Sequence, residues 1–169
     1  MEPRGRVWPP THLTAHESAI EFLRFLRITA VNKLAGLSDE VAARTPLATS
    51  PVMSPLGVVK HLTALERWWV RIVLAGQDVP SLWDDDPESD WRLGPADTVD
   101  SVVAAYDAEA SVSGELLRQL PPTHTGTFDG DHRSVRSAGW VVTHLTQETA
   151  RHVGHLDILR ELIDGSRGE

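Results

Sequence analysis

The chain has 169 residues, a mass of 18.6 kDa and a formal charge of −8 at pH 7 with neutral histidines. This length suits one domain with a single core, and the acidic balance argues against nucleic-acid binding, which needs a basic patch. Cysteine is absent, which excludes disulfides, a cysteine nucleophile and cysteine-ligated zinc. Because no apolar run approaches a membrane span and no signal-peptide centre is present, we expect a cytoplasmic protein.

Two helices are predicted in the first half of the chain. Residues 1–10 are rich in proline and lack periodicity, which predicts a loose tail before a single domain over 11–169. Apolar residues then recur at helical spacing over about 14–34. After a connector rich in Pro, Ser and Thr, Ser54 is typical of the N-cap of a second helix, because a proline follows it directly, and this helix ends before Gly76.

Two more helices are predicted in the second half. Asp97 can cap a third helix, which ends at Leu120 before a pair of prolines. Residues 123–136 are polar and indicate a loop or weak hairpin, after which Ser137 opens a fourth helix that reaches Asp164. Since no alternating strand pattern competes, the sequence predicts an all-α four-helix bundle with two long connectors.

The fourth predicted helix carries polar residues on the side that should face the core. Its inward positions follow the spacing of a bundle helix and are Val141, Leu145, Glu148, His152, His155, Leu159 and Leu162. The ends of this set are aliphatic, but Glu148 and His152 lie in its middle. They are one turn apart, so their side chains are neighbours on one face of the helix. Burying an unpaired carboxylate costs several kcal/mol, so Glu148 needs a partner or a metal.

The second predicted helix offers a matching histidine. Its inward positions are Val58, His61, Leu65, Trp68 and Ile72. Two imidazoles and one carboxylate leave an open coordination position, as in catalytic zinc sites, and the same set suits non-haem iron. Two alternatives stay open: His61 is a hydrogen-bonded core histidine, or Glu148 and His152 form a buried charge pair assisted by Arg151 or Arg160.

Several further residues are candidates for roles beside this triad. His144 and His155 share nearly the same face and could serve as catalytic groups. We place His155 beside the ligands because three protein ligands complete a catalytic site; its alternative is a core histidine bonded to a backbone carbonyl. Trp68 is a candidate substrate contact, with core packing as the plainer interpretation. The acidic run Asp84–Asp86 is interpreted as a solvated loop, because it lacks a calcium-binding pattern.

Three segments carry a resemblance to a known family. They are SPLGVVKHLTALERWW (54–69), WDDDPESDW (83–91) and HLTQETARHVGHLDILRELIDG (144–165). With them the chain resembles the DinB-like metal-binding bundle superfamily, and within it the actinobacterial branch allied to mycothiol-dependent maleylpyruvate isomerase and related thiol S-transferases. A weaker similarity in KLAGLSDEVAARTPL extends the resemblance back to about residue 33, so that it covers most of the chain.

The resemblance implies a ligand set. Members of the superfamily hold a divalent metal, often zinc or nickel, with one histidine of the second helix and two residues of the last. The isomerase uses Glu and His at the two last-helix positions, which match Glu148 and His152 here, with His61 as the third ligand. His155 stands where many relatives have glutamine. The isomerase also has a further C-terminal domain, whereas this chain ends at Glu169, so that enzyme's own activity does not follow from the resemblance.

Three functions are compatible with these observations. The first is a metal-dependent enzyme that activates a low-molecular-weight thiol of the mycothiol type, for S-transfer to a small electrophile or for its isomerisation. A metal-bound thiol loses its proton readily, which supplies the nucleophile that a chain without cysteine lacks. The second is a metal-dependent hydrolase with His144 or His155 as the base. The third is a non-catalytic bundle that binds a metal or a small molecule.

A homodimer through a helix face is also expected. Trp68, Trp69 and Trp140 exceed what one small core readily buries. The alternative is a monomer whose tryptophans line the ligand pocket. The partners we expect are the small substrate and the thiol, with neither nucleic acid nor membrane.

Overall fold

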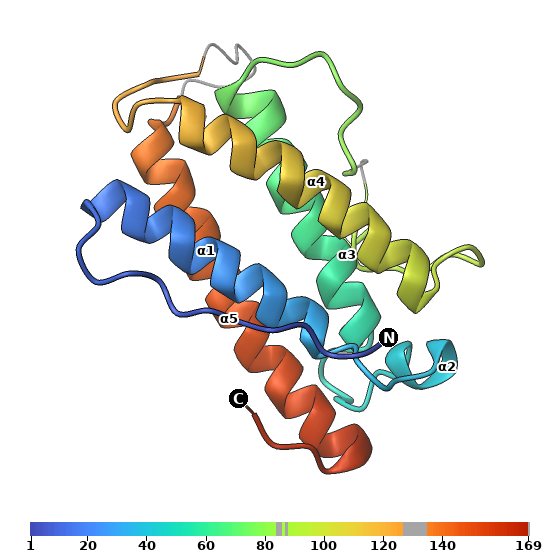
Figure 1. Ribbon diagram of the computed structural model, residues 1–169. Helices are drawn as coiled ribbons and strands as arrows, with labels where there is room; N and C mark the ends of the chain where they lie inside the picture. The colour runs from blue at the N-terminus through green and yellow to red at the C-terminus, as the bar shows by residue number, and fades with distance from the viewer. Residues whose placement is uncertain (84–85, 87, 127–134, 169) are drawn as a thin grey trace.

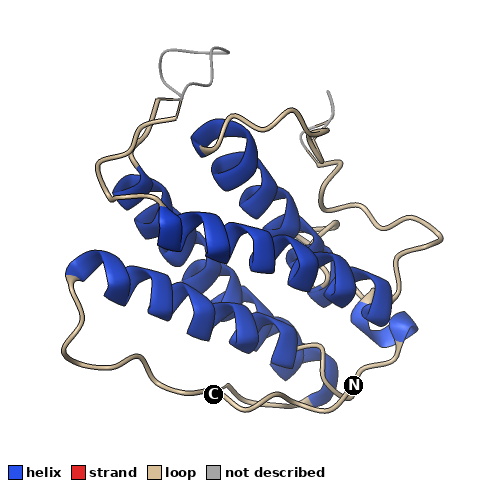
Figure 2. Cartoon of the chain, turned by 45° about the horizontal axis from the view of Figure 1, so that its top comes forward, coloured by secondary structure: helices blue, strands red, loops and turns tan. Residues whose placement is uncertain are grey.

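The computed structural model describes residues 1–83, 86, 88–126 and 135–168, and within them the chain is helical without a sheet (Figures 1 and 2). One isolated antiparallel bridge joins Thr125 to Ser137. The elements are α1 (Ala15–Asn32), α2 (Asp39–Ala42), α3 (Pro55–Glu66), the π-helix η1 (Arg67–Leu74), α4 (Val99–Gln119) and α5 (Ala138–Asp164). The predicted all-α class is confirmed, and α2 is a short addition within the first connector.

The ends of the long helices follow local capping chemistry. Ser54 and Ser137 are the N-caps of α3 and α5, as predicted. The third helix begins one residue later than predicted, because Thr98 rather than Asp97 caps it. Asp97 instead accepts a hydrogen bond from Lys60 Nζ at 2.8 Å. Leu162, predicted to face inward, is 54% exposed, because the regular spacing drifts around a straight helix over this length.

The second predicted helix changes its winding halfway along. Residues beyond Glu66 form η1, in which the Ala75 amide donates to the Val70 carbonyl, five residues back, at 2.9 Å. Single π turns of this kind often accompany functional sites. Here Trp68 packs against the Trp83 ring, and the adjacent Trp69 packs against a ring of α5. The two neighbouring tryptophans thus contact different elements.

The bundle pairs α1 mainly with α5 and α3 with α4, while α3 also contacts α5 (Figure 1). A buried ion pair crosses the core between α1 and α3. Arg27 donates through Nε and Nη2 to the two carboxylate oxygens of Glu66, at 2.7 Å each. Because both side chains are buried, this bidentate pair fixes α1 against the last turn of α3.

The first ten residues have no regular structure but contact α1 along its length (Figure 1). The Arg4 amide donates to Asn32 Oδ1 at 2.7 Å, and the Arg4 guanidinium pairs with Asp107 of α4. Further along, the Trp8 ring stacks on Phe25 with centroids 4.6 Å apart. Residues 1–10 therefore make more specific contacts than the predicted loose tail would make. The division of the chain into tail and domain stays a prediction.

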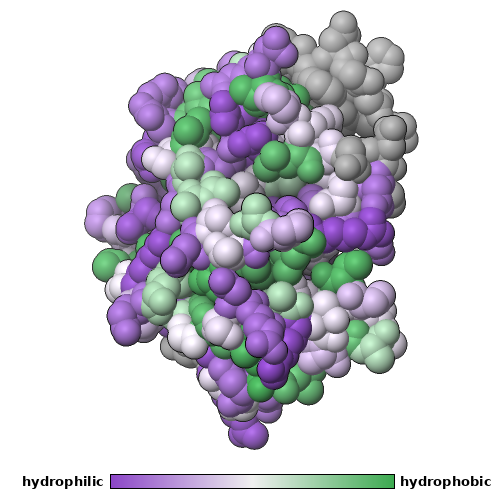
Figure 3. All heavy atoms as spheres, turned by 90° about the vertical axis from the view of Figure 1, so that its right-hand side faces the viewer, coloured by the Kyte–Doolittle hydropathy of each residue, from purple (hydrophilic) through white to green (hydrophobic). Residues whose placement is uncertain are grey.

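Two predicted loops fall partly outside the described residues. These are 127–134, within the predicted loop or weak hairpin, and most of the acidic run, of which Asp86 alone is described. Asp86 is half-buried and pairs with Arg92. Elsewhere in the described chain, no helix is long and apolar enough to cross a membrane. The face shown in Figure 3 intersperses hydrophilic and hydrophobic residues.

Candidate functional site

His61 is held in one orientation by a buried carboxylate. It lies on α3, and its Nδ1 is 2.5 Å from Oδ2 of Asp90, which is 2% exposed. Trp83 donates its indole N–H to the same oxygen at 2.5 Å, and the Trp91 ring stacks on the imidazole at 4.0 Å. Asp90 accepts a hydrogen bond from the Nδ1–H of His61, so Nε2 keeps its lone pair for a further ligand.

His152 lies opposite on α5 and is buried. Its ring centroid is 4.9 Å from that of His61 and 5.3 Å from that of Trp91. Burial, followed by the neighbouring rings of His61 and His155, lowers the pKa of His152 from 6.5 to about 3. The imidazole is therefore neutral over the whole physiological range, which is the state a metal ligand requires.

Glu148 is half-buried one turn before His152. Its Oε2 lies 3.7 Å from His152 Nε2, and its Oε1 lies 3.2 Å from the Arg151 guanidinium. Arg160, the other predicted partner, pairs with Asp164 instead. The exposed Arg151 guanidinium thus contacts both oxygens of Glu148, and Oε2 also lies toward His152.

The three predicted ligands share one region without forming a closed set. His152 lies beside both His61 and Glu148. Among the described residues, however, no group of three or more His, Asp or Glu side chains is gathered as in a formed metal site. The donor chemistry suits a divalent ion nonetheless: a His61 oriented by Asp90 follows the pattern in which a carboxylate fixes the imidazole that binds a metal.

The other predicted residues separate into two groups. Nδ1 of His155 is 3.2 Å from Nδ1 of His152, rather than beside a backbone carbonyl. His144 stacks on Trp140 at 4.7 Å and meets Trp69 edge-on at 5.0 Å; burial lowers its pKa, and the charge of Glu148 opposes this shift. Trp68 packs on Trp83, the same indole that binds Asp90.

Asp90, Trp83 and Trp91 are the site residues that the sequence reasoning missed. They belong to the loop between η1 and α4, in which the sequence analysis considered only the carboxylates of the acidic run. The sequence did contain a signal for these residues. Trp83 and Trp91 lie at the two ends of one segment of this loop, and Asp90 directly precedes Trp91. Such aromatic residues indicate a loop that folds back onto the core, where an adjacent carboxylate must find a partner.

The comparison with protein families identifies a family for this chain. A family model described as mycothiol-S-transferase matches residues 19–165. The matched region includes α3, the loop with Asp90 and all of α5, and so contains every residue of the site described above. No curated protein matches the chain.

Proposed function

This chain belongs to the mycothiol-S-transferase family. We propose that it joins mycothiol, through its sulfur atom, to small electrophiles at the site around His61 and His152. The match confirms the predicted family and the enzyme class that its description indicates. The observation that carries the site assignment is the meeting of two histidines from different helices beside a carboxylate. Since the 169 residues include no cysteine, the reacting sulfur belongs to the co-substrate.

A divalent metal is part of this proposal, with zinc preferred over nickel or iron. His61, Glu148 and His152 would hold it, because two neutral imidazoles and a carboxylate leave a position open for the thiol. When bound, the metal lowers the pKa of the thiol so that the sulfur is a thiolate near neutral pH. The support is the donor set itself, together with the Asp90 contact that leaves Nε2 of His61 available.

The surrounding residues prepare the reaction. Asp90 fixes the tautomer of His61, and the stacked Trp91 covers that ring and limits access of water. A His152 that uses Nε2 as a ligand carries its proton on Nδ1 and donates it to Nδ1 of His155. His155 then keeps its own proton on Nε2, where an N–H donor is available to the sulfur or to the leaving group.

The partners follow from the reaction. They are a reduced thiol and a small electrophile, and we place the enzyme in the cytoplasm, where low-molecular-weight thiols are kept reduced. A homodimer stays a prediction of the sequence. The proposal excludes nucleic acid as a partner, given the charge of −8.

One experiment tests the proposal. The purified protein is analysed for metal, then assayed with monobromobimane or chlorodinitrobenzene in the presence and absence of mycothiol. His61→Ala and His152→Ala should each lose metal and thiol-dependent turnover with unchanged far-ultraviolet dichroism. His12→Ala, at an exposed histidine outside the helices, is the matched control and should behave as wild type.

Three results would contradict the proposal. Turnover without thiol would indicate a hydrolase, and metal binding without any turnover would indicate a binding protein. Full metal occupancy in both His61→Ala and His152→Ala would remove those residues from the ligand set.

A further inference from the structure

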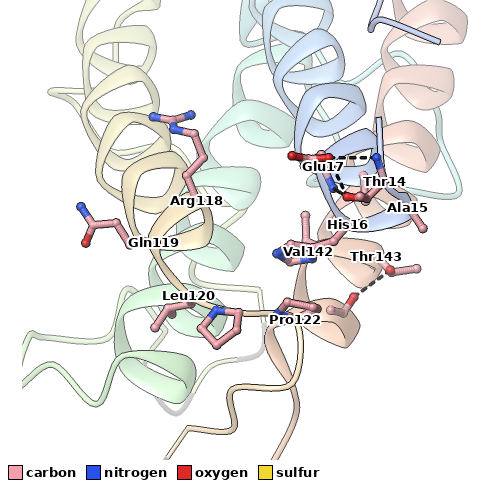
Figure 4. A pocket seen from close by; sticks show the side chains of 13 residues that line it. Thr14, Ala15, His16, Glu17, Arg118, Gln119, Leu120, Pro122, Val142 and Thr143 are labelled. Carbon is pink, nitrogen blue, oxygen red and sulfur yellow. Dashed lines mark hydrogen bonds between the residues drawn. The ribbon is translucent and has the colours of Figure 1, made fainter. Parts of the chain in front are cut away.

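A cavity lies away from the residues assigned to S-transfer. It opens between the first turns of α1, the last turn of α4 and the first turns of α5, and its volume is about 840 Å³ (Figure 4). Its lining includes Ala15 and His16 from α1, Arg118 and Leu120 from the end of α4, and Val142 from α5. None of its lining residues belongs to the triad, to the Asp90 loop or to His155.

A neighbouring cavity of about 560 Å³ continues this space along α1. The two cavities share His16, Glu17 and Arg118, so these residues stand at their junction. The second part has an apolar wall that includes Trp8 of the N-terminal segment and Ile20 of α1. We call the joined space the α1–α4 cleft. Each of its two parts has a volume within the range of small-molecule sites, and the lining is mixed as in such sites.

His16 is the unusual residue of the cleft. Both of its ring nitrogens are shielded from solvent, yet neither has a hydrogen-bond partner among the described residues. Its imidazole extends from α1 beside Val142 (Figure 4). Buried polar atoms are nearly always paired in proteins, so an orphaned imidazole at a cavity indicates a partner that is not part of the chain.

Arg118 supplies an uncompensated positive charge. Within the described chain no acid pairs with it and no acceptor bonds it, and its side chain is exposed. The nearby acids are already engaged: Glu17 accepts from the amide and hydroxyl of Thr14, and Glu21 pairs with Arg24. A guanidinium with free donors beside a largely apolar cavity is suited to a carboxylate.

We propose that the α1–α4 cleft is a second ligand site, for a small amphipathic monocarboxylate. The ligand's carboxylate bonds Arg118. His16 bonds either the same carboxylate or a second polar group of the ligand. The apolar body of the ligand lies against Ile20, Leu120 and Val142. The inference does not rest on the S-transferase activity, because the two sites share no residue.

The test uses a matched pair of probes on the full chain with its native metal content. 2-Naphthoate and its neutral counterpart 2-naphthamide are titrated by two-dimensional amide NMR and by calorimetry. Naphthoate should shift the amides of Gly139, Val142 and Thr143, while naphthamide should bind at least about tenfold more weakly because it lacks the charge. Equal affinity for the two probes, or no shift at these amides, would overturn the proposal.

Variants separate binding from folding. Arg118→Met should weaken naphthoate about tenfold, and Arg118→Lys should restore part of the loss. Arg44→Met, at an exposed arginine outside the cleft, is the control and should leave affinity unchanged. His16→Leu should weaken naphthoate and yet raise Tm by roughly 2–4 °C, since it removes an unpaired buried group. An unchanged affinity in Arg118→Met, or a lowered Tm in His16→Leu, would show that ordered water and packing alone account for these residues.

Discussion

A single carboxylate decides how the imidazole of His61 is presented. Oδ2 of Asp90 receives both the His61 ring and the Trp83 indole, while its Oδ1 is buried without a partner among the described residues. A carboxyl group so enclosed is costly unless it accepts hydrogen bonds, which the imidazole and the indole supply. Asp90 is therefore a positioning residue, which acts on the site only through His61.

Asp90→Asn should reduce metal affinity roughly 10–100-fold, as loss of a carboxylate behind a metal-binding histidine does. The amide is close in size, so far-ultraviolet dichroism should not change. Competition with a chelator measures the affinity. Asp78→Asn, at an exposed loop aspartate, is the matched control. Wild-type affinity in Asp90→Asn would mean that Asp90 serves packing alone.

His155→Gln should keep the metal and alter turnover, because His155 contacts a proposed ligand through its ring without belonging to the set. Glutamine retains an N–H donor but cannot pass a proton on, so kcat should fall and its dependence on pH should change. Metal analysis and a pH series of kcat provide the measurement. A loss of metal as complete as that of His152→Ala would make His155 a ligand.

The depressed pKa of His152 gives the metal-free protein a defined pH dependence. In the unfolded chain this histidine binds a proton near pH 6.5, whereas in the folded protein it does so only near pH 3. The unfolded state therefore binds more protons between these values, and the free energy of unfolding falls as the pH is lowered from 6.5 to 3. Urea titrations in chelator measure it, and His152→Gln should reduce the slope; an unchanged slope would contradict the assignment.

At the scale of elements, local chemistry explains what the sequence could predict. Ser54 with its following proline, and Ser137 at the start of α5, are short-range signals that act within one turn, and both hold in the structure. The π winding of η1 was not predicted, because the helical spacing of apolar residues over this segment gave no sign of a change in winding. Asp90 shows the same limit for the site, since its pairing with His61 spans 29 positions and a loop without periodicity.

The buried pair between α1 and α3 gives a test at this scale. Arg27→Met leaves Glu66 buried without its partner and should lower the free energy of unfolding by about 3–5 kcal/mol. Arg24→Met removes the exposed pair with Glu21 on the same helix and should cost under about 1 kcal/mol. Urea denaturation compares the two, and equal losses would show that the Arg27 pair contributes no more than a surface pair.

At the scale of the molecule, the two sites use different sides of α5. The proposed S-transferase site lies where α5 meets α3 and the Asp90 loop, while the α1–α4 cleft lies where the first turns of α5 meet α1 and the end of α4. α5 is thus common to both, and Val142 of the cleft is separated from Glu148 by less than two turns.

The last prediction, the homodimer, rests on a stripe of exposed apolar residues along α5. Ile158 is 51% and Leu162 54% exposed, one turn apart, and Trp140 is 40% exposed near the other end of the helix. Between them Gly154 has open space where a side chain would stand, which allows another helix to approach closely. This stripe replaces Trp68 and Trp69 as the basis for a dimer, because both are half-buried within the bundle.

Sedimentation at micromolar concentration should therefore give twice the 18.6 kDa of the chain. Ile158→Asp should convert the dimer to monomer, because an isologous interface places the new charge opposite apolar groups or its own copy. Val112→Asp, at a 37% exposed valine of α4, is the matched control and should leave the mass unchanged. A wild-type mass near 18.6 kDa would reject the dimer and leave the stripe as ordinary exposed surface.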